Sequence, residues 1–310
     1  FIVASTVSSS ADARRISSVR KTSQLNDAPK RSRWPAMPWL IRGCVVVMLT
    51  LIVIGAAAPI IAPHDPISQT LTARLSPPVW SAEGSTEYLL GADQLGRDLL
   101  SRVIYGARIS LTIGVFGMVV GFLLGGTLGV IAGFARGALD DIIMFLVDVQ
   151  LAMPFIIVAL AVIAIFGTNL TVLLILVGFA GWEGFARISR GMVLSTSENS
   201  YIEAAQSIGA SRTRIVARHI VPNIMAPLIV YATLNLTSII LLESTLSFLG
   251  IGVQPPMASW GRMIAEGREH LNTAWWLAVV PGAAIMLVTM SISLFGDWLR
   301  DALDPTLRGR

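Results

Sequence analysis

The sequence predicts an all-α membrane protein with six transmembrane helices. Three observations support this fold class: a mean hydropathy of +0.70, a charged fraction of only 14%, and six apolar runs along 310 residues. A soluble domain is about 25% charged, whereas a helix needs about 20 mostly apolar residues to cross a bilayer. Such runs satisfy their backbone hydrogen bonds in lipid only as helices or closed barrels. The composition excludes a soluble enzyme, a disordered protein and a coiled coil.

The six predicted spans cover about residues 43–61, 109–134, 142–166, 170–186, 224–249 and 273–295. In the third, Pro154 predicts a kink because proline removes a backbone donor. The fourth has the shortest apolar run and reaches Ala186 only by passing Glu183. Along the second, glycines recur mainly at every fourth position and predict close helix packing: Gly114, Gly117, Gly121, Gly125 and Gly129.

The first span has a second interpretation. A basic stretch, the apolar run 44–54 and the small residues 56–58 resemble a signal peptide. The basic stretch is unusually long for one and five more spans follow, so we expect a retained helix. The single cysteine, Cys44, lies in this run and excludes an intrachain disulfide or a cysteine-based metal cluster.

Positive charge is concentrated in a tail. Residues 1–40 carry a net charge of +5, and the remainder carries −1. We expect this tail to be disordered or to lie on a membrane surface, and we expect no nucleic-acid partner. The membrane domain is then 41–306.

Arginine and lysine also predict the orientation. With both termini in the cytoplasm, 17 of the 23 basic residues lie on the cytoplasmic side, as the positive-inside rule requires. The outer loops are then 62–108 and 250–272, and a large inner loop covers 187–223.

The inner loop predicts two short helices that meet at Gly209. Ser200 and Glu203 have the spacing of a capping box, Gly209 suits a left-handed stop, and Ser211 can cap a second helix that Pro222 ends. The first helix has one small and apolar face, formed by Tyr201, Ala204, Ala205 and Ile208. Helices this short need a docking partner, which is either the protein's own membrane domain with its lipid interface, or a soluble protein.

This loop resembles a known motif. Glu203, Ala204 and Ala205, followed by Gly209 and Pro222, look like the "EAA" loop of ABC-importer permeases. The family pattern has Ile and Leu where this chain has His219 and Val221. The run 219–223 instead resembles the variant found in dipeptide/oligopeptide/nickel permeases.

Three further stretches resemble that subfamily and its C-type subunit: residues 90–108, 246–261 and 296–305. The resemblance covers about residues 40–306. It implies the type I ABC importer permease fold, with a cytoplasmic EAA coupling loop, in a bacterial inner membrane.

The resemblance also implies an assembly and its substrate. The partners would be a second, homologous permease, two cytoplasmic ABC ATPases and an extracytoplasmic substrate-binding protein, all around a lipid-embedded path. This chain would hold no cofactor, because ATP and Mg would bind the ATPases. It would pass peptides by alternating access, with nickel chelates and haem as alternative cargo. The residues expected to couple it to the ATPases are Tyr201, Glu203, Ala204, Ala205, Gly209 and Arg212.

Two acids inside predicted spans are candidates for the translocation path, because intramembrane charges are unfavourable and often functional. Asp148 either faces the path or pairs with an arginine near the interface. Glu243 either meets a peptide's amino terminus or makes a hydrogen bond between helices.

The outer loops supply candidates for a binding-protein dock or an outer gate: Arg97, Asp98, Arg102 and Trp260. The first three are expected to pair with one another before the second span. The segment 62–108 is interpreted either as a plug over the outer mouth or as a dock.

Other function classes lack their motifs. The chain has no phosphate-binding loop, no HExxH and no GxSxG, so we expect no catalytic residue, no bound metal and no ATP hydrolysis by this chain. An ion-driven secondary transporter or channel is the main alternative, and a membrane-embedded hydrolase is the third.

Overall fold

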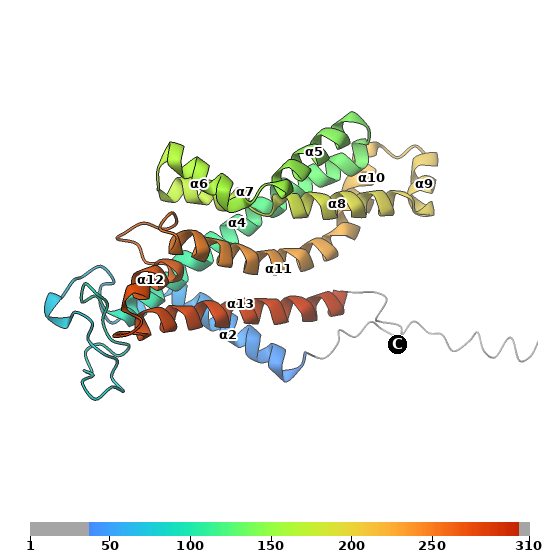
Figure 1. The fold of residues 1–310 in the computed structure, drawn as a ribbon. Helices are drawn as coiled ribbons and strands as arrows, with labels where there is room; N and C mark the ends of the chain where they lie inside the picture. Colours follow the sequence, from blue (N-terminus) through green and yellow to red (C-terminus); the bar gives the residue numbers. More distant parts are fainter. Residues whose placement is uncertain (1–36, 304–310) are drawn as a thin grey trace, which may run out of the picture. The chain divides into compact units, whose positions relative to one another are not determined.

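Figure 1 shows the computed structural model of the chain, which describes residues 37–303. In that part the regular structure is helical, and a single β-bridge joins Ala92 and Asp98. Five helices are long and apolar enough to cross a membrane, or six if one bent pair counts as a span. The predicted all-α membrane fold is therefore confirmed. Most of the predicted basic tail, and the end of the chain from Asp304, lie outside the described residues.

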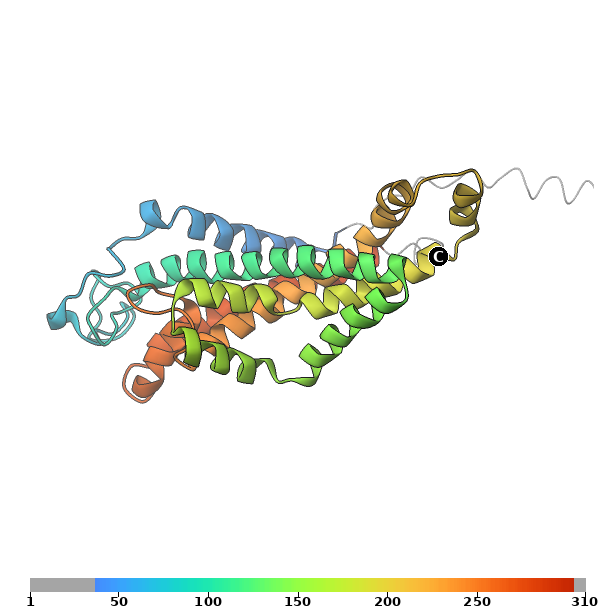
Figure 2. The same cartoon turned by 90° about the horizontal axis from the view of Figure 1, so that it is seen from above.

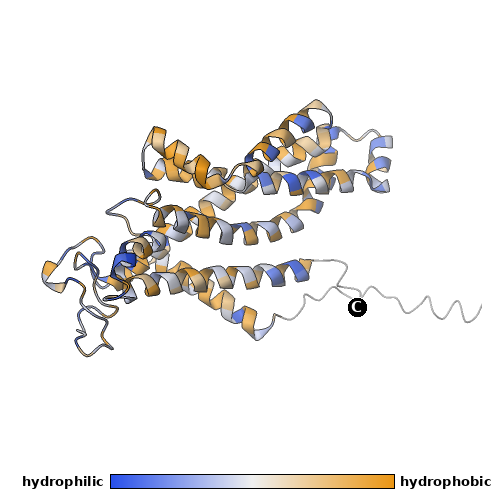
Figure 3. Cartoon of the chain, in the orientation of Figure 1, coloured by the Kyte–Doolittle hydropathy of each residue, from blue (hydrophilic) through white to orange (hydrophobic). Residues whose placement is uncertain are grey.

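The elements follow in this order: α2 Trp39–Ala56, α3 Ala58–Ile61, η1 Leu71–Ala73, α4 Leu99–Ala135, α5 Ala138–Ala152, α6 Phe155–Phe166, α7 Leu170–Phe179, α8 Trp182–Ser197, α9 Ser200–Ser207, α10 Arg212–Ile215, the π-helical η2 Val216–Ile220, α11 Val221–Phe248, α12 Trp260–Gly267, η3 Arg268–His270 and α13 Trp276–Leu303. Figure 3 shows apolar residues along the long helices and polar residues over α9 and α12.

Helix α4 lies at the centre of the packing, with α2, α7, α8 and α11 against it. Its glycine stripe makes this possible, as the sequence predicts. A Cβ on Gly125 would overlap the carbonyl oxygen of Trp182, and one on Gly129 would overlap that of Ala186. Close backbone approach of this kind is typical of small residues in membrane helix pairs.

Several helices run beyond their predicted spans. Helix α4 begins at Leu99, ten residues before the predicted start, because Asp98 caps it and accepts a hydrogen bond from the Ser101 amide at 2.9 Å. Helix α8 continues to Ser197. Hydropathy marks only the apolar part of a helix, so it misses polar turns at the ends.

The predicted kink in the third span is a complete break. Helices α5 and α6 meet at 90° around Pro154, as Figures 1 and 2 show. The fourth span is also interrupted, because Ala180 is extended and Gly181 adopts a left-handed φ of +87° between α7 and α8.

Candidate functional site

Helix α9 is attached to the membrane domain mainly through one side chain. Ile202 is fully buried, and it packs in a cluster with Ile215, Ile220, Phe185 and Val193. The apolar side of α10 and η2 therefore faces the long helices, which is one of the two docking partners that the sequence left open. This anchor fixes α9 while leaving its other faces uncovered.

The predicted capping box is wrong. The N-cap position is Asn199, and Ser200 is already the first helical residue, so no side chain caps α9. The Glu203 amide instead approaches the Asn199 carbonyl oxygen at 3.4 Å. Because Asn199 is already in an extended conformation, the helix starts one residue after it, and Ser200 is too far along to act as the cap. Glu203 therefore does not serve as the cap of this helix.

The predicted stop at Gly209 is confirmed, with a φ of +82°. The Ala210 amide donates to the Ala205 carbonyl at 3.0 Å, and the Gly209 amide donates to that of Gln206 at 2.9 Å. These two bonds form a Schellman motif. A glycine is required here because other residues adopt a left-handed conformation only at a cost of about 1–2 kcal/mol.

The second predicted helix starts as expected but does not stop at Pro222. The Ser211 hydroxyl caps α10 by accepting from the Arg214 amide at 3.4 Å. The chain then passes through η2 directly into α11, so Arg212–Phe248 is one long helical run. Pro222 is the second residue of α11 and directly follows the π-helical η2, so the proline falls where the helix type changes and not inside a regular α-helix.

The small, apolar face of α9 is open. Tyr201, Ala204, Ala205 and Ile208 border a hollow of about 480 Å³, and Tyr201 and Ile208 are 46% and 86% exposed. We call these four residues the plug face. Asn223 orients the tyrosine by donating to its hydroxyl at 2.8 Å. Apart from this hydrogen bond to α11, the described chain leaves Tyr201, Ala204 and Ile208 exposed and Ala205 half-buried.

The other coupling candidates lie elsewhere on the same loop. Glu203 and Arg212 border a second, polar hollow of about 690 Å³ between the loop and the end of α4. Arg214, Arg218 and His219 stand beside the plug face, so positive charge surrounds an apolar patch there. An apolar centre with a polar rim is the usual anatomy of a protein interface.

At the opposite end of α4, Arg97 and Arg102 are buried and share two acids. Arg97 contacts Asp93 at 2.6 Å and Glu266 at 3.1 Å; Arg102 contacts the same residues at 2.5 and 2.9 Å. The predicted mutual pairing with Asp98 is wrong, because Asp98 caps α4 and accepts from Ser101. We call Asp93, Arg97, Arg102 and Glu266 the outer ion cluster.

The outer candidates are buried, and their assignment to a dock or an outer gate stays a prediction. Arg97, Asp98 and Arg102 are at most 5% exposed and Trp260 is fully buried, with its indole nitrogen donating to the Val103 carbonyl at 3.0 Å. A docked protein would not reach these side chains in this conformation. Sequence reasoning missed Asp93, although it precedes Arg97 by four residues, and Glu266, which is 169 residues away from Arg97.

The two intramembrane acids have different environments. Glu243 is fully buried, and it accepts hydrogen bonds from Ser110 on α4 at 3.2 Å and from Ser247 at 2.7 Å. Asp148 is exposed and pairs with Arg187 at 2.6 Å. Sequence reasoning did not single out a third acid, Glu183, although it named this residue as the polar interruption of the fourth span. Within residues 37–303, no three His, Cys, Asp or Glu side chains form a metal site.

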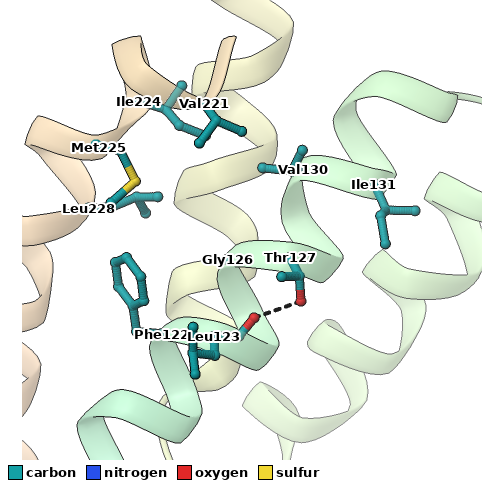
Figure 4. Close-up of a pocket in the computed structure, with 10 residues that line it drawn as sticks. All are labelled: Phe122, Leu123, Gly126, Thr127, Val130, Ile131, Val221, Ile224, Met225 and Leu228. Atoms are coloured by element: carbon teal, nitrogen blue, oxygen red, sulfur yellow. Dashed lines mark hydrogen bonds between the residues drawn. The ribbon is translucent and has the colours of Figure 1, made fainter. Parts of the chain in front are cut away.

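An apolar cavity of about 320 Å³ lies between α4 and α11, and Figure 4 shows the residues that line it. Phe122, Ile224 and Leu228 are among its lining residues. Its polar side chain, Thr127, bonds to the backbone carbonyl of Leu123 on its own helix at 2.6 Å. This lining offers no partner to the charged ends of a small polar molecule.

Known proteins resemble the chain in sequence. Residues 125–309 match the family described as "Binding-protein-dependent transport system inner membrane component". The "Di/tripeptide transport system permease protein DppC" of Pseudomonas aeruginosa is 42% identical over 86% of this chain and 88% of its own length. The "Dipeptide transport system permease protein DppC" of Bacillus subtilis is 38% identical over 84% and 80%. The "Probable D,D-dipeptide transport system permease protein DdpC" of Escherichia coli is 36% identical over 94% and 95%.

A solved structure resembles the fold. The MetNI methionine ABC transporter, in an inward-facing conformation, includes a chain that matches with a TM-score of 0.53 and 20% identity. The match covers 66% of the present chain and 98% of that chain. At this identity the likeness supports the type I importer permease fold alone.

Proposed function

Since the chain belongs to the family of binding-protein-dependent transport system inner membrane components, we propose that it forms half of the path by which an ABC importer carries peptides across the inner membrane. It is a transport permease and not an enzyme. Relatives at 36–42% identity are named for dipeptide or di/tripeptide transport, which supports peptide cargo over nickel chelates or haem. The family and the named peptide permeases favour an ABC importer over an ion-driven transporter or channel.

The open plug face carries the coupling part of the proposal. The four small or apolar side chains of this face border an open hollow, three of them are exposed, and arginines stand beside them. Burying exposed apolar area contributes about 25 cal/mol per Å². A groove on a cytoplasmic ATPase would bury this face, and the arginines would steer its approach. Movement of that ATPase would be transmitted to the membrane helices through Ile202 and through the continuous helical run that leads from α10 into α11.

The remaining partners follow from the importer architecture. An extracytoplasmic binding protein delivers the peptide, a second and homologous permease supplies the other half of the path, and lipid covers the outer helix faces. ATP and Mg bind the ATPases. The proposed orientation places both termini and α9 in the cytoplasm, which the basic-residue distribution supports.

The test compares two neighbouring positions on α9. Ala205→Glu places a charge on the plug face, whereas Gln206→Glu places the same side chain away from that face, where Gln206 borders the polar hollow. We expect Ala205→Glu to reduce the ATPase that co-purifies with the permeases at least tenfold, since a desolvated charge in an apolar contact costs several kcal/mol. Gln206→Glu should retain more than half of the ATPase that co-purifies with the wild-type permeases.

The permease pair itself should assemble equally in both variants, as measured by its yield and elution volume. Equal ATPase recovery from Ala205→Glu and wild type would contradict the assignment of this face. Because ATPases are cytoplasmic, loss of binding in that variant alone also tests the orientation.

A further inference from the structure

The two interrupted spans meet at one residue, Gln150. This side chain lies at the end of α5, just before the break at Pro154. Its amide nitrogen donates to the Phe179 carbonyl at 2.9 Å, where α7 ends, and its oxygen accepts from the Trp182 indole at 2.5 Å, where α8 begins. Backbone groups that lose their helical hydrogen bonds inside a membrane need side-chain partners of this kind. Gln150 therefore holds both breaks side by side.

The same amide nitrogen donates to a carboxylate, that of Glu183, at 3.0 Å. Glu183 lies midway along the run Leu170–Ser197 and is half-buried. No arginine, lysine or histidine of the described residues lies within 4.0 Å of it, and the nearby Arg187 is paired with Asp148. An intramembrane carboxylate without an ion-pair partner is unfavourable, and such residues mark substrate or ion pathways.

Helix α11 brings two more polar side chains to this place. Glycines on both sides of Trp182 and Glu183 admit them: a Cβ on Gly184 would overlap the Tyr231 hydroxyl, and one on Gly181 would overlap the Asn235 amide nitrogen. Asn235 is 7% exposed, and its oxygen has no hydrogen-bond partner among the described residues. A buried acceptor without a donor calls for a ligand or a water.

A hollow of about 480 Å³ reaches this place through Gln150 and Trp182, whereas Glu183, Tyr231 and Asn235 are not among its lining residues. Met153, Phe155, Leu176 and Phe179 are among its apolar residues. An apolar surface with few polar groups is the usual composition of a small-molecule site, and Gln150 links this one to the Glu183 carboxylate. Glu243 has no comparable opening, since it is fully buried among serine hydroxyls.

We propose that Glu183, with Gln150, Tyr231 and Asn235, forms a site within the membrane domain that binds the ammonium group of a peptide in transit. We call these four residues the mid-span site. The Glu183 carboxylate supplies the negative counter-charge that an ammonium group needs in an apolar path. The Asn235 oxygen and the Tyr231 hydroxyl accept hydrogen bonds from the other N–H groups of the ammonium. The inference rests on the proposed peptide cargo, and it names the residues of this chain that recognise the cargo after the binding protein has released it.

The test is ATP-driven uptake of radiolabelled alanyl-alanine by the complete importer in proteoliposomes, with binding protein varied up to saturation. Glu183→Gln keeps the size of the side chain and removes its charge. We expect the maximal uptake rate to fall at least tenfold, while the half-saturating binding-protein concentration and the ATP hydrolysis rate stay within twofold of wild type. Glu183→Asp should restore at least a third of the rate, because it restores the charge. Asp301→Asn, an exposed acid near the end of α13, should match wild type.

Every other outcome contradicts either the mid-span site or the proposed function. Wild-type uptake by Glu183→Gln would overturn the mid-span site and leave the importer intact. Loss of ATP hydrolysis or of assembly in Glu183→Gln would mean that the residue is structural, and would equally overturn the site. Absence of peptide uptake by the wild-type importer would refute the proposed function itself, and the site with it.

Discussion

At the residue scale, the outer ion cluster shows which contacts a sequence motif can predict and which become visible only in the folded structure. The sequence predicted that Arg97 and Arg102 matter, because they lie in a motif of charged residues. It paired them with the wrong acid, since Glu266 approaches from α12 only through the packing of α12 against α4 and α13. The four-residue spacing to Arg97 could have revealed Asp93, which was missed, but no local spacing reveals a partner from a distant element such as Glu266.

Removing one acid from this cluster should strongly destabilise the outer end of the domain. Glu266→Gln leaves two buried guanidinium groups with one carboxylate between them, and breaking a buried ion pair costs about 3–5 kcal/mol. We expect a lower Tm of the purified permease in detergent, measured by tryptophan fluorescence. Glu87→Gln changes an exposed acid of the same outer segment and should leave the Tm unchanged. An unchanged Tm for Glu266→Gln would show that the cluster contributes no stability.

At the element scale, helix positions and their close packing followed from periodicity, but helix ends and breaks did not. The glycine spacing of the second span predicted its contact, since the period of a helix places every fourth residue on one face. The ends depend on caps and long-range partners: Asn199 displaces Ser200 from the cap of α9, and η2 carries the helix past Pro222. Pro154 predicted a kink, but the 90° break also depends on Gln150 bridging to α7 and α8.

Two glycines three residues apart on α4 provide a matched test of the α4–α8 contact. A methyl group at position 129 would overlap the Ala186 carbonyl, whereas one at position 126 meets nothing closer than the Ser189 hydroxyl at 4.0 Å. Overpacking costs about 1–3 kcal/mol, so we expect Gly129→Ala to lower the Tm. Gly126→Ala should be neutral or slightly stabilising, because alanine favours the helix. Equal Tm values for both variants would refute the contact as the reason for the stripe.

At the scale of the whole molecule, fold class and family followed from the sequence because they rest on many residues at once: hydropathy, charge asymmetry and four separate motifs. The exposure of the plug face and the convergence of Gln150, Glu183, Tyr231 and Asn235 did not follow, because both depend on how four helices pack. The same packing moved Arg97, Arg102 and Trp260 from a predicted docking surface into the interior.

Peptide uptake into proteoliposomes, measured with each partner omitted in turn, tests the proposed importer function most directly. We expect labelled dipeptide to accumulate only when both permeases, the ATPases, the binding protein and ATP are all present. Under the same conditions Ala205→Glu should abolish uptake by losing the ATPase. Accumulation driven by an imposed ion gradient, with no ATPase present, would contradict the account and make the chain a secondary transporter.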